Sequence, residues 1–392
     1  MPWRARLSVA AAVLAVTFMS VAAAAQAFTA NGSVKQVYVT GLGAHAQMTL
    51  IDGAGRTVAR KRADGLGGLL FRDVKPGSGY RARLSKSGVK SRPLTVLSTQ
   101  AAPPSTDVYN QTLPTDGYGY LTTRDGTKLA VNVHPPSDVS DVAPISIHLP
   151  RAAAPGPSPT LIEYSGYGYA NPAGPTNGIA ILANLMGFTV VDVNMRGTGC
   201  SGGAFDFFEP LQNLDGYDVI ETVARQPWVL HHKVGMMGIS YGGISQLFTA
   251  QLQPPSLAAI SPLSVIDATQ TTLYPGGVLN TGFAVAWAKE RQNEAKPASP
   301  HGGQSWAYKQ IQDGDQTCKT NQVLHGEAAN LLAKIRANSH YKPAVADPLS
   351  PITFVHKIKV PTFLACQWED EQTGGHCPEL VSHFTGTDKK WF

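Results

Sequence analysis

Charged residues are scarce in this sequence of 392 residues: Asp, Glu, Lys and Arg make up 15% of it, and the formal net charge is +5. No run of basic residues occurs beyond the first few positions. A nucleic-acid-binding surface needs clustered Lys and Arg, so we expect no nucleic-acid partner. Hydrophobic residues make up 43% of the chain, which is typical of a folded globular protein and excludes a disordered one.

Cysteines are few as well, and none forms a CxxC pair: the chain has Cys200, Cys318, Cys366 and Cys377. Only Cys377 has a histidine at ligand spacing, the adjacent His376. This arrangement is not a metal-binding pattern, so we expect no metal site. One or two disulfides are expected if the protein is exported, with free buried thiols as the alternative. Four cysteines allow three pairings, and the sequence does not choose among them.

Long apolar runs are missing after the N-terminal segment. That segment begins with Arg4 and Arg6, continues with an apolar core at residues 9–21 and reaches Ala-Gln-Ala at residues 25–27. This order predicts a signal peptide over residues 1–27, and therefore a secreted or cell-envelope protein. A membrane-anchoring helix is the alternative, although the apolar core is short for a span of about 20 residues.

Short β-rich segments separated by turn signals occupy residues 28–100. The turns are Asp52-Gly53, Asp64-Gly65 and Pro76-Gly77. Even spacing of short strands predicts a small β-sandwich-like domain, followed by a linker at residues 101–119. This domain could attach the protein or present a substrate, or it could serve only as a stabilising spacer.

From residue 120 onward, strands alternate with helices. Apolar strands are predicted at residues 159–165, 188–195 and 233–239, with helical patterns between them. Strands that are apolar on both faces predict an α/β fold with a mostly parallel sheet covered by helices. We expect a first core part at residues 120–266, a helical cap at 267–351 and a second core part at 352–392.

A glycine-flanked serine, Gly238-Ile-Ser-Tyr-Gly242, follows the third of these strands and precedes a helical pattern. A strand, Gly-x-Ser-x-Gly and a helix in that order form a nucleophile elbow, which exposes the serine above the carboxyl end of the sheet. Ser240 is therefore the candidate nucleophile, and the backbone N–H of Tyr241 is a candidate oxyanion donor. The alternative is a glycine-rich turn with an idle serine.

The motifs around this serine are specific when taken together. Residues 194–203, NMRGTGCSGG, and residues 215–243, which contain DGYD, QPW and GISYGG, resemble the X-Pro dipeptidyl-peptidase/cocaine esterase family of α/β-hydrolases. The resemblance runs from about residue 120 to the C-terminus. It implies that a tyrosine hydroxyl is the second oxyanion donor, which matches Tyr167, with Tyr164 and Tyr169 as close rivals.

The resemblance also implies a catalytic acid after a later strand. The segment at residues 361–372, PTFLACQWEDEQ, places Asp370 at the matching position. Its neighbours Glu369 and Glu371 are rivals, and so is Asp267 at the end of an earlier strand. The acid would orient a histidine and stabilise its positive charge during turnover.

The histidine itself has no clear counterpart. The family places it a few tens of residues beyond the acid, and this chain continues for 22 residues after Asp370 (392 − 370). Downstream lie His376 and His383, while His231 and His232 precede the elbow strand and break the expected order. We expect a truncated chain without the catalytic histidine and without the family's C-terminal jelly-roll domain.

Arg196, within the NMRGTGCSGG loop, has two interpretations. It could anchor that loop by binding Asp215 or Asp218, or it could contact a substrate carboxylate. The loop itself is expected to shape the wall of the substrate pocket.

Taken together, the sequence predicts an exported serine hydrolase that acts on a small ester or peptide, including X-Pro dipeptides, without any cofactor. The alternative is a non-catalytic surface or binding protein that carries a relic hydrolase domain. The sequence does not indicate an oligomeric state.

Overall fold

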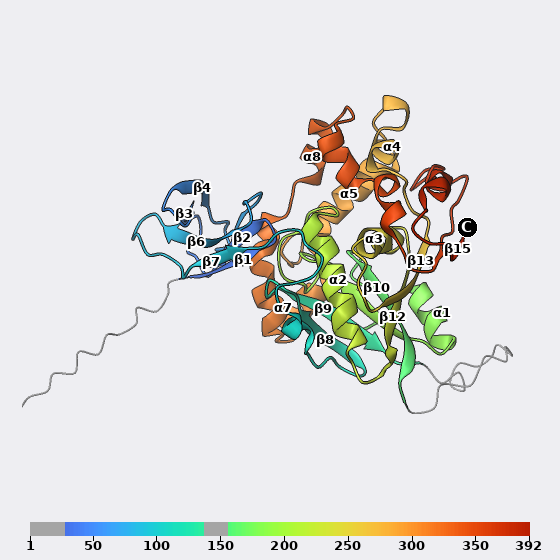
Figure 1. The fold of residues 1–392 in the computed structure, drawn as a ribbon. Helices are drawn as coiled ribbons and strands as arrows, with labels where there is room; N and C mark the ends of the chain where they lie inside the picture. Colours follow the sequence, from blue (N-terminus) through green and yellow to red (C-terminus); the bar gives the residue numbers. More distant parts are fainter. Residues whose placement is uncertain (1–27, 137–155) are drawn as a thin grey trace, which may run out of the picture.

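The structure, a computed structural model, describes residues 28–136 and 156–392. The predicted signal peptide lies outside the described residues. The N-terminal strands form a small lobe (blue in Figure 1) beside a larger lobe built on a central sheet. Within the described ranges, no helix combines the length and the apolar character needed to cross a bilayer.

The small lobe consists of two antiparallel sheets that enclose a core of their own. Alternate residues of a strand point to opposite faces, so Val37 and Val39, or Met48 and Leu50, reach this core together. The first sheet contains β1 (Thr29–Ser33), β2 (Gln36–Thr40) and β5 (Leu69–Phe71), and the second contains β4 (Thr57–Arg62), β3 (Gln47–Ile51), β6 (Gly77–Leu84) and β7 (Leu94–Val96).

The large lobe contains an eight-stranded sheet. Its strands β8 and β9 run antiparallel to their neighbours, whereas the strands from β11 to β15 pair in parallel. This confirms the predicted α/β class with a mostly parallel sheet. In spatial order the strands are β15 (Lys390–Trp391), β14 (Thr362–Phe363), β13 (Leu257–Leu263), β12 (Val229–Ile239), β10 (Ser158–Ser165), β11 (Thr189–Asn194), β9 (Lys128–His134) and β8 (Gly117–Thr122).

Helices cover both faces of this sheet, as the two-sided apolar strands predict. Leu161 on β10 packs with α1 (Gly178–Leu185). The next residue, Ile162, belongs to the larger core that also contains residues of α2 (Pro210–Ala224) and α3 (Tyr241–Ala250). Because adjacent strand residues point to opposite faces, α1 lies on one side of the sheet, and α2 and α3 lie on the other.

The predicted cap, residues 267–351, is helical: Figure 1 shows α4, α5 and α8 at the top of the molecule and α7 lower down, beside β8 and β9. Its α-helices are α4 (Thr269–Leu273), α5 (Phe283–Glu294), α6 (Ser305–Gln312), α7 (Gln316–Asn321), α8 (Leu331–Ala337) and α9 (Pro343–Ala346). Short 3-10 helices complete the chain: η1 (Thr106–Tyr109), η3 (Pro275–Gly277), η4 (Gln322–Glu327), η5 (Asp347–Leu349), η6 (Pro351–Thr353), η7 (Val355–Lys357) and η8 (Cys377–His383).

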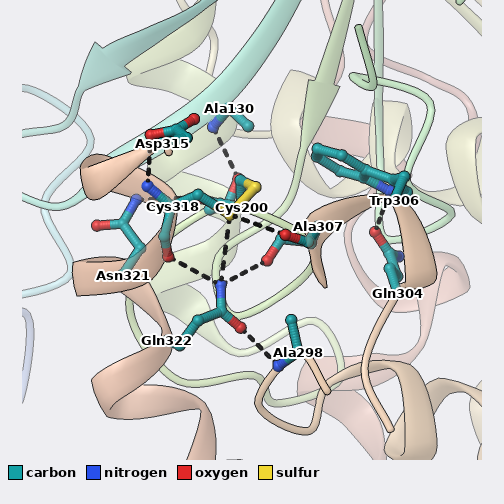
Figure 2. Close-up of a disulfide and its surroundings, with 12 residues drawn as sticks. Ala130, Cys200, Ala298, Gln304, Trp306, Ala307, Asp315, Cys318, Asn321 and Gln322 are labelled. Carbon is teal, nitrogen blue, oxygen red and sulfur yellow. Dashed lines mark hydrogen bonds between the residues drawn. A yellow bond between two sulfur atoms is a disulfide. The ribbon is translucent and has the colours of Figure 1, made fainter. Parts of the chain in front are cut away.

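Two disulfides pair the four cysteines. Cys200, in the loop after β11, is joined to Cys318 on α7, so this bond ties the cap to the core. Figure 2 shows Gln322 beside it, where the side-chain amide donates to the carbonyl oxygen of Gly199 at 3.0 Å. The second bond, Cys366–Cys377, closes the short segment that contains the candidate acid.

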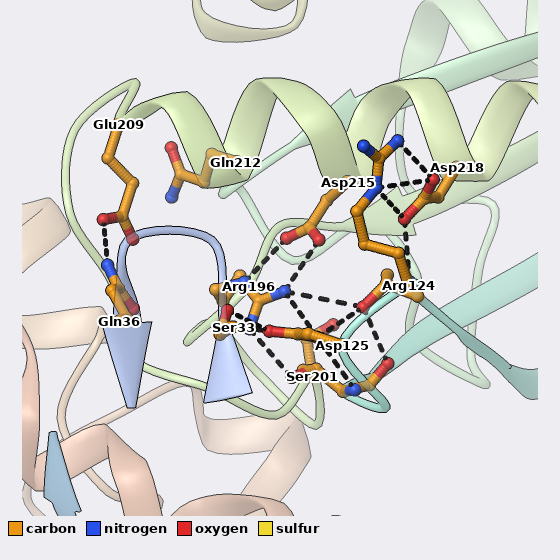
Figure 3. A network of polar contacts seen from close by, with 12 residues as sticks. Ser33, Gln36, Arg124, Asp125, Arg196, Ser201, Glu209, Gln212, Asp215 and Asp218 are labelled. Carbon is orange, nitrogen blue, oxygen red and sulfur yellow. Dashed lines mark hydrogen bonds and ion pairs between the residues drawn. The ribbon is translucent and has the colours of Figure 1, made fainter. Parts of the chain in front are cut away.

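A buried ion-pair network joins the two lobes (Figure 3). The Arg196 guanidinium donates two hydrogen bonds to Asp215, at 2.7 and 2.8 Å, and also pairs with Asp125 at 3.0 Å. The Ser33 hydroxyl of the small lobe donates to the same Asp125 at 2.5 Å. Arg196 therefore anchors its loop, as one interpretation predicted, through Asp215. Asp218 instead pairs with Arg124 at 2.7 Å.

We expect Arg196→Met to lower the free energy of unfolding by about 3–5 kcal/mol, because it leaves Asp125 and Asp215 buried without their counter-ion. Urea unfolding would measure this loss. The matched control is Arg60→Met on the exposed face of β4, which should change stability by less than about 0.5 kcal/mol. Equal losses in the two variants would contradict the assigned role of Arg196.

A row of buried polar residues crosses the centre of the sheet on the α1 side. Glu163 on β10 lies in register with Asp192 on β11, and Asp192 contacts the His134 ring nitrogen Nε2 at 3.1 Å. One oxygen of Glu163, Oε2, is buried without a hydrogen-bond partner. Burial raises the pKa of Glu163 well above its ordinary value, and the charge of Asp192 raises it further.

The folded chain therefore holds the Glu163 proton at pH values where the unfolded chain has released it. It follows that the free energy of unfolding falls as pH rises above the ordinary glutamate range. Glu163→Gln should remove this contribution and flatten the pH dependence of stability between about pH 5 and about pH 8. Urea unfolding at both pH values would test this against the exposed Glu369→Gln, and an unchanged slope in Glu163→Gln would refute it.

Candidate active site

Ser240 lies at the turn between β12 and α3, with backbone angles φ 56° and ψ −118°. A residue with a side chain rarely adopts this conformation, which costs about 1–3 kcal/mol and persists only where surrounding contacts enforce it. Here the Ser240 N–H donates to the Leu263 carbonyl of β13 at 2.9 Å, and the Ser240 carbonyl accepts from the Ile244 N–H at 2.7 Å. The predicted strand–turn–helix arrangement around Ser240 is thus present.

Two glycines allow the turn to be this tight. A Cβ atom on Gly242 would lie 2.3 Å from the Glu163 carboxylate, and one on Gly243 would lie 2.4 Å from the Leu263 carbonyl oxygen. Any side chain at either position would push α3 away from the sheet. The two glycines therefore allow the first turn of α3 to pack directly against the strand ends of the sheet.

Tyr167 is the tyrosine that reaches the serine: its hydroxyl oxygen lies 3.1 Å from Ser240 Oγ. Tyr164 is fully buried and donates instead to the Gln212 carbonyl at 2.9 Å. Tyr169 packs edge-on against the Tyr167 ring. Tyr241 is the first residue of α3, where a backbone N–H has no acceptor within the helix. The arrangement thus offers a phenol and a backbone N–H beside one hydroxyl.

Ser240 borders a cavity of about 130 Å³ beneath the cap. Most of its lining is apolar and comes from α3, the cap helices and the loop before α2, and includes Phe207, Ile244, Leu273, Trp287 and Leu331. The loop at residues 196–203, which was expected to form the pocket wall, contributes no lining residue. Its residues are buried instead, and the Cys200–Cys318 disulfide and the hydrogen bond from Gln322 to Gly199 join the loop to α7 and η4.

Asp370 lies at the same edge of the sheet as Ser240. Its carboxylate accepts a hydrogen bond from the Ser264 hydroxyl, one residue past the Leu263 carbonyl that holds Ser240. The Thr373 hydroxyl and N–H donate to it at 2.7 and 2.9 Å. Partial burial raises the pKa of Asp370, but these hydrogen bonds outweigh that effect and hold it below the ordinary value, so the carboxylate is ionised.

The rival acids have other surroundings. Asp267 is buried and accepts a hydrogen bond from Thr271 within the cap at 2.6 Å. Glu369 and Glu371 are exposed on either side of Asp370. None of the three is hydrogen-bonded to Ser264.

No histidine of the described ranges is hydrogen-bonded to Ser240 or Asp370. His376 and His383 are exposed, and so are His231 and His232 near the start of β12. His340, which the sequence analysis did not single out, lines the cavity from the cap. In residues 28–136 and 156–392, moreover, His, Cys, Asp and Glu side chains form no group of three that could hold a metal ion.

Trp287 is a second site residue that the sequence did not reveal. It lies on α5, borders the cavity, and donates its indole N–H to the Tyr167 hydroxyl at 3.3 Å. The only sequence signal was an aromatic residue within a predicted cap helix, which is also typical of simple packing.

The comparisons with known proteins concern the family and the fold of the chain. A family model described as X-Pro dipeptidyl-peptidase (S15 family) matches residues 125–392. A putative serine esterase of Mycobacterium tuberculosis is 28% identical over 192 residues, which cover 45% of this chain and 28% of that protein. The cocaine esterase of Rhodococcus sp. is 28% identical over 171 residues, 42% of this chain and 26% of the esterase. The chain thus spans less than a third of the length of these curated relatives.

Among solved structures, a CocE/NonD family hydrolase from Staphylococcus aureus superposes with a TM-score of 0.51 at 19% identity. The superposition covers 70% of this chain and 45% of that one, and it supports the α/β-hydrolase fold. The resemblance predicted from the sequence motifs is confirmed, because the family model covers more than half of the chain: the protein belongs to the X-Pro dipeptidyl-peptidase (S15) family.

Proposed function

We propose that this protein is an exported serine hydrolase that cleaves carboxylic esters with an uncharged, apolar acyl group. One observation carries the proposal: the strained Ser240 borders an apolar cavity while its hydroxyl lies 3.1 Å from that of Tyr167. Membership of the family and the names of the esterase relatives support it.

The reaction would proceed through an acyl-enzyme. Ser240 Oγ attacks the ester carbonyl carbon and gives its proton to a base, while the carbonyl oxygen becomes an oxyanion held by Tyr167 and the Tyr241 N–H. The oxyanion collapses, and the alcohol leaves with the proton. Water then releases the acid by the same steps. Asp370 would act through the histidine base.

Three predictions about the ends of the chain stay predictions. They are a signal peptide over residues 1–27, a chain without the catalytic histidine, and a chain without the family's jelly-roll domain.

The lining of the cavity favours an ester over an X-Pro dipeptide. A dipeptide substrate carries an α-ammonium group, which needs an anionic partner when it is removed from water. No Asp or Glu of the described residues lines this cavity, whereas Lys334 and Lys342 do. Lys334 is neutralised by Asp206, which lies 2.9 Å from its ammonium group, whereas Lys342 has no carboxylate partner among the described residues. Lys342 would repel an ammonium group, so a neutral acyl group fits better.

The alternative is a non-catalytic binding protein with a relic hydrolase domain. The lack of a hydrogen-bonded histidine at Ser240 in the described residues favours it. The strained backbone of Ser240 argues against it, because a conformation that lowers stability is not expected to persist without a use.

We expect a fluorophosphonate probe to label Ser240, with added imidazole as an external base, and Ser240→Ala to abolish the labelling. Ser382→Ala, at an exposed position, is the matched control and should be labelled normally. Mass spectrometry of the labelled peptide would identify the site. The unlabelled chain, with the same added imidazole, should hydrolyse p-nitrophenyl butanoate faster than Gly-Pro p-nitroanilide. No labelling even with imidazole would favour the binding-protein alternative, and faster cleavage of the anilide would overturn the acyl-group assignment.

Tyr167→Phe should slow labelling and hydrolysis by about 10²–10³-fold with little change in KM, because the phenol stabilises only the developing oxyanion. Tyr169→Phe removes a neighbouring hydroxyl that has no hydrogen bond to Ser240, so it should keep the rate within about threefold. Steady-state kinetics on the butanoate ester separates the two effects. If Tyr169→Phe were the slower variant, the oxyanion donor would be reassigned.

A further inference from the structure

The Tyr167 hydroxyl has a second partner, which comes from the cap. Trp287 donates its indole N–H to the Tyr167 oxygen at 3.3 Å, and the same oxygen lies 3.1 Å from Ser240 Oγ. Trp287 is 120 residues further along the chain, on α5. An indole N–H is only a donor, so the direction of this hydrogen bond is fixed: the phenol oxygen accepts.

This contact decides where the phenol proton points. Tyr167 has a single proton to donate, and the lone pair facing Trp287 is already used. The proton is therefore directed to the other side of the oxygen, where Ser240 lies and where a substrate oxyanion would form. A hydroxyl that accepts one hydrogen bond is also polarised into a stronger donor for the next.

A buried cation reinforces the arrangement from the same helix. Arg291 follows Trp287 by one turn, and its guanidinium carbon lies 4.9 Å from the centre of the Tyr167 ring and 5.8 Å from that of Trp287. Its side chain is 5% exposed and is held by Glu290 and Glu294 at 2.9 and 2.6 Å. A cation over the face of this half-buried phenol attracts the ring and restricts its rotation.

We propose that Trp287 is a positioning residue of the oxyanion hole: its N–H orients the Tyr167 hydroxyl, so that the cap helix α5 assembles one of the two oxyanion donors. The inference rests on the proposed function, in which Tyr167 stabilises the oxyanion. The cap would then do more than cover the cavity, because the position of α5 would determine how well the Tyr167 hydroxyl donates to the oxyanion.

A double-mutant cycle tests this. Trp287→Phe removes the N–H and keeps an aromatic ring in the cavity wall. We expect it to slow fluorophosphonate labelling of Ser240 about tenfold, the equivalent of one ordinary hydrogen bond. In the Tyr167→Phe background, the same substitution should have less than about a twofold effect, because no hydroxyl is left to orient. An equal slowing in both backgrounds, or none in the wild type, would overturn the proposal.

The control is Trp391→Phe on β15, which removes an exposed indole N–H away from the Tyr167 loop. It should leave the labelling rate unchanged. Urea unfolding of each variant checks that slow labelling does not reflect a loss of folding.

A readout without catalysis separates the two proposals. The indole 1H–15N signal of Trp287, assigned by its disappearance in Trp287→Phe, should shift in Tyr167→Phe, and the signal of the exposed Trp391 should not. An unmoved Trp287 signal would refute the contact whatever the enzyme does. If the signal shifts but Ser240 is never labelled in any variant, the proposed hydrolase function fails, and the catalytic part of this inference fails with it.

Discussion

The site depends on one carbonyl group at the end of β13. The Leu263 oxygen accepts the Ser240 N–H at 2.9 Å and holds the strained turn, and it also lies where any side chain on Gly243 would stand. The next residue, Ser264, donates its hydroxyl to Asp370. A single strand end thus fixes the candidate nucleophile, the start of α3 and the candidate acid relative to one another. A shift of β13 by one residue would disturb all three.

The parts that the sequence predicts are those encoded locally. The apolar run of β12, the glycines around Ser240 and the helix after them lie within about 25 residues, and each reflects a backbone preference that does not need distant contacts. The α/β class follows in the same way from alternating strands and helices. Tyr167 is different, because it came from the family resemblance, and Tyr164, Tyr167 and Tyr169 are indistinguishable by chemistry alone.

What the sequence does not predict is set by contacts between distant segments. Asp215 and Asp218 are three residues apart on α2, so they lie on the same face and are equivalent as partners for Arg196. The structure separates them through Arg124, which takes Asp218. The pairing of Cys200 with Cys318 spans 118 residues, and the contact of Trp287 with Tyr167 spans 120. A single sequence does not show which residues of two such distant segments lie next to each other in the fold.

The two candidate oxyanion donors differ in what holds them. The Tyr241 N–H belongs to the backbone of the elbow and is as rigid as the strand end beneath it. The Tyr167 hydroxyl belongs to a loop that receives two hydrogen bonds from the cap. Trp287 donates to the hydroxyl itself, and Gln304 donates to the Gly166 carbonyl at 2.9 Å. The Cys200–Cys318 bond fastens that cap to the core at a distance from the site. Displacing the cap would therefore leave the serine and one donor in place and release the other, so the serine would be least reactive when the cavity is open to water.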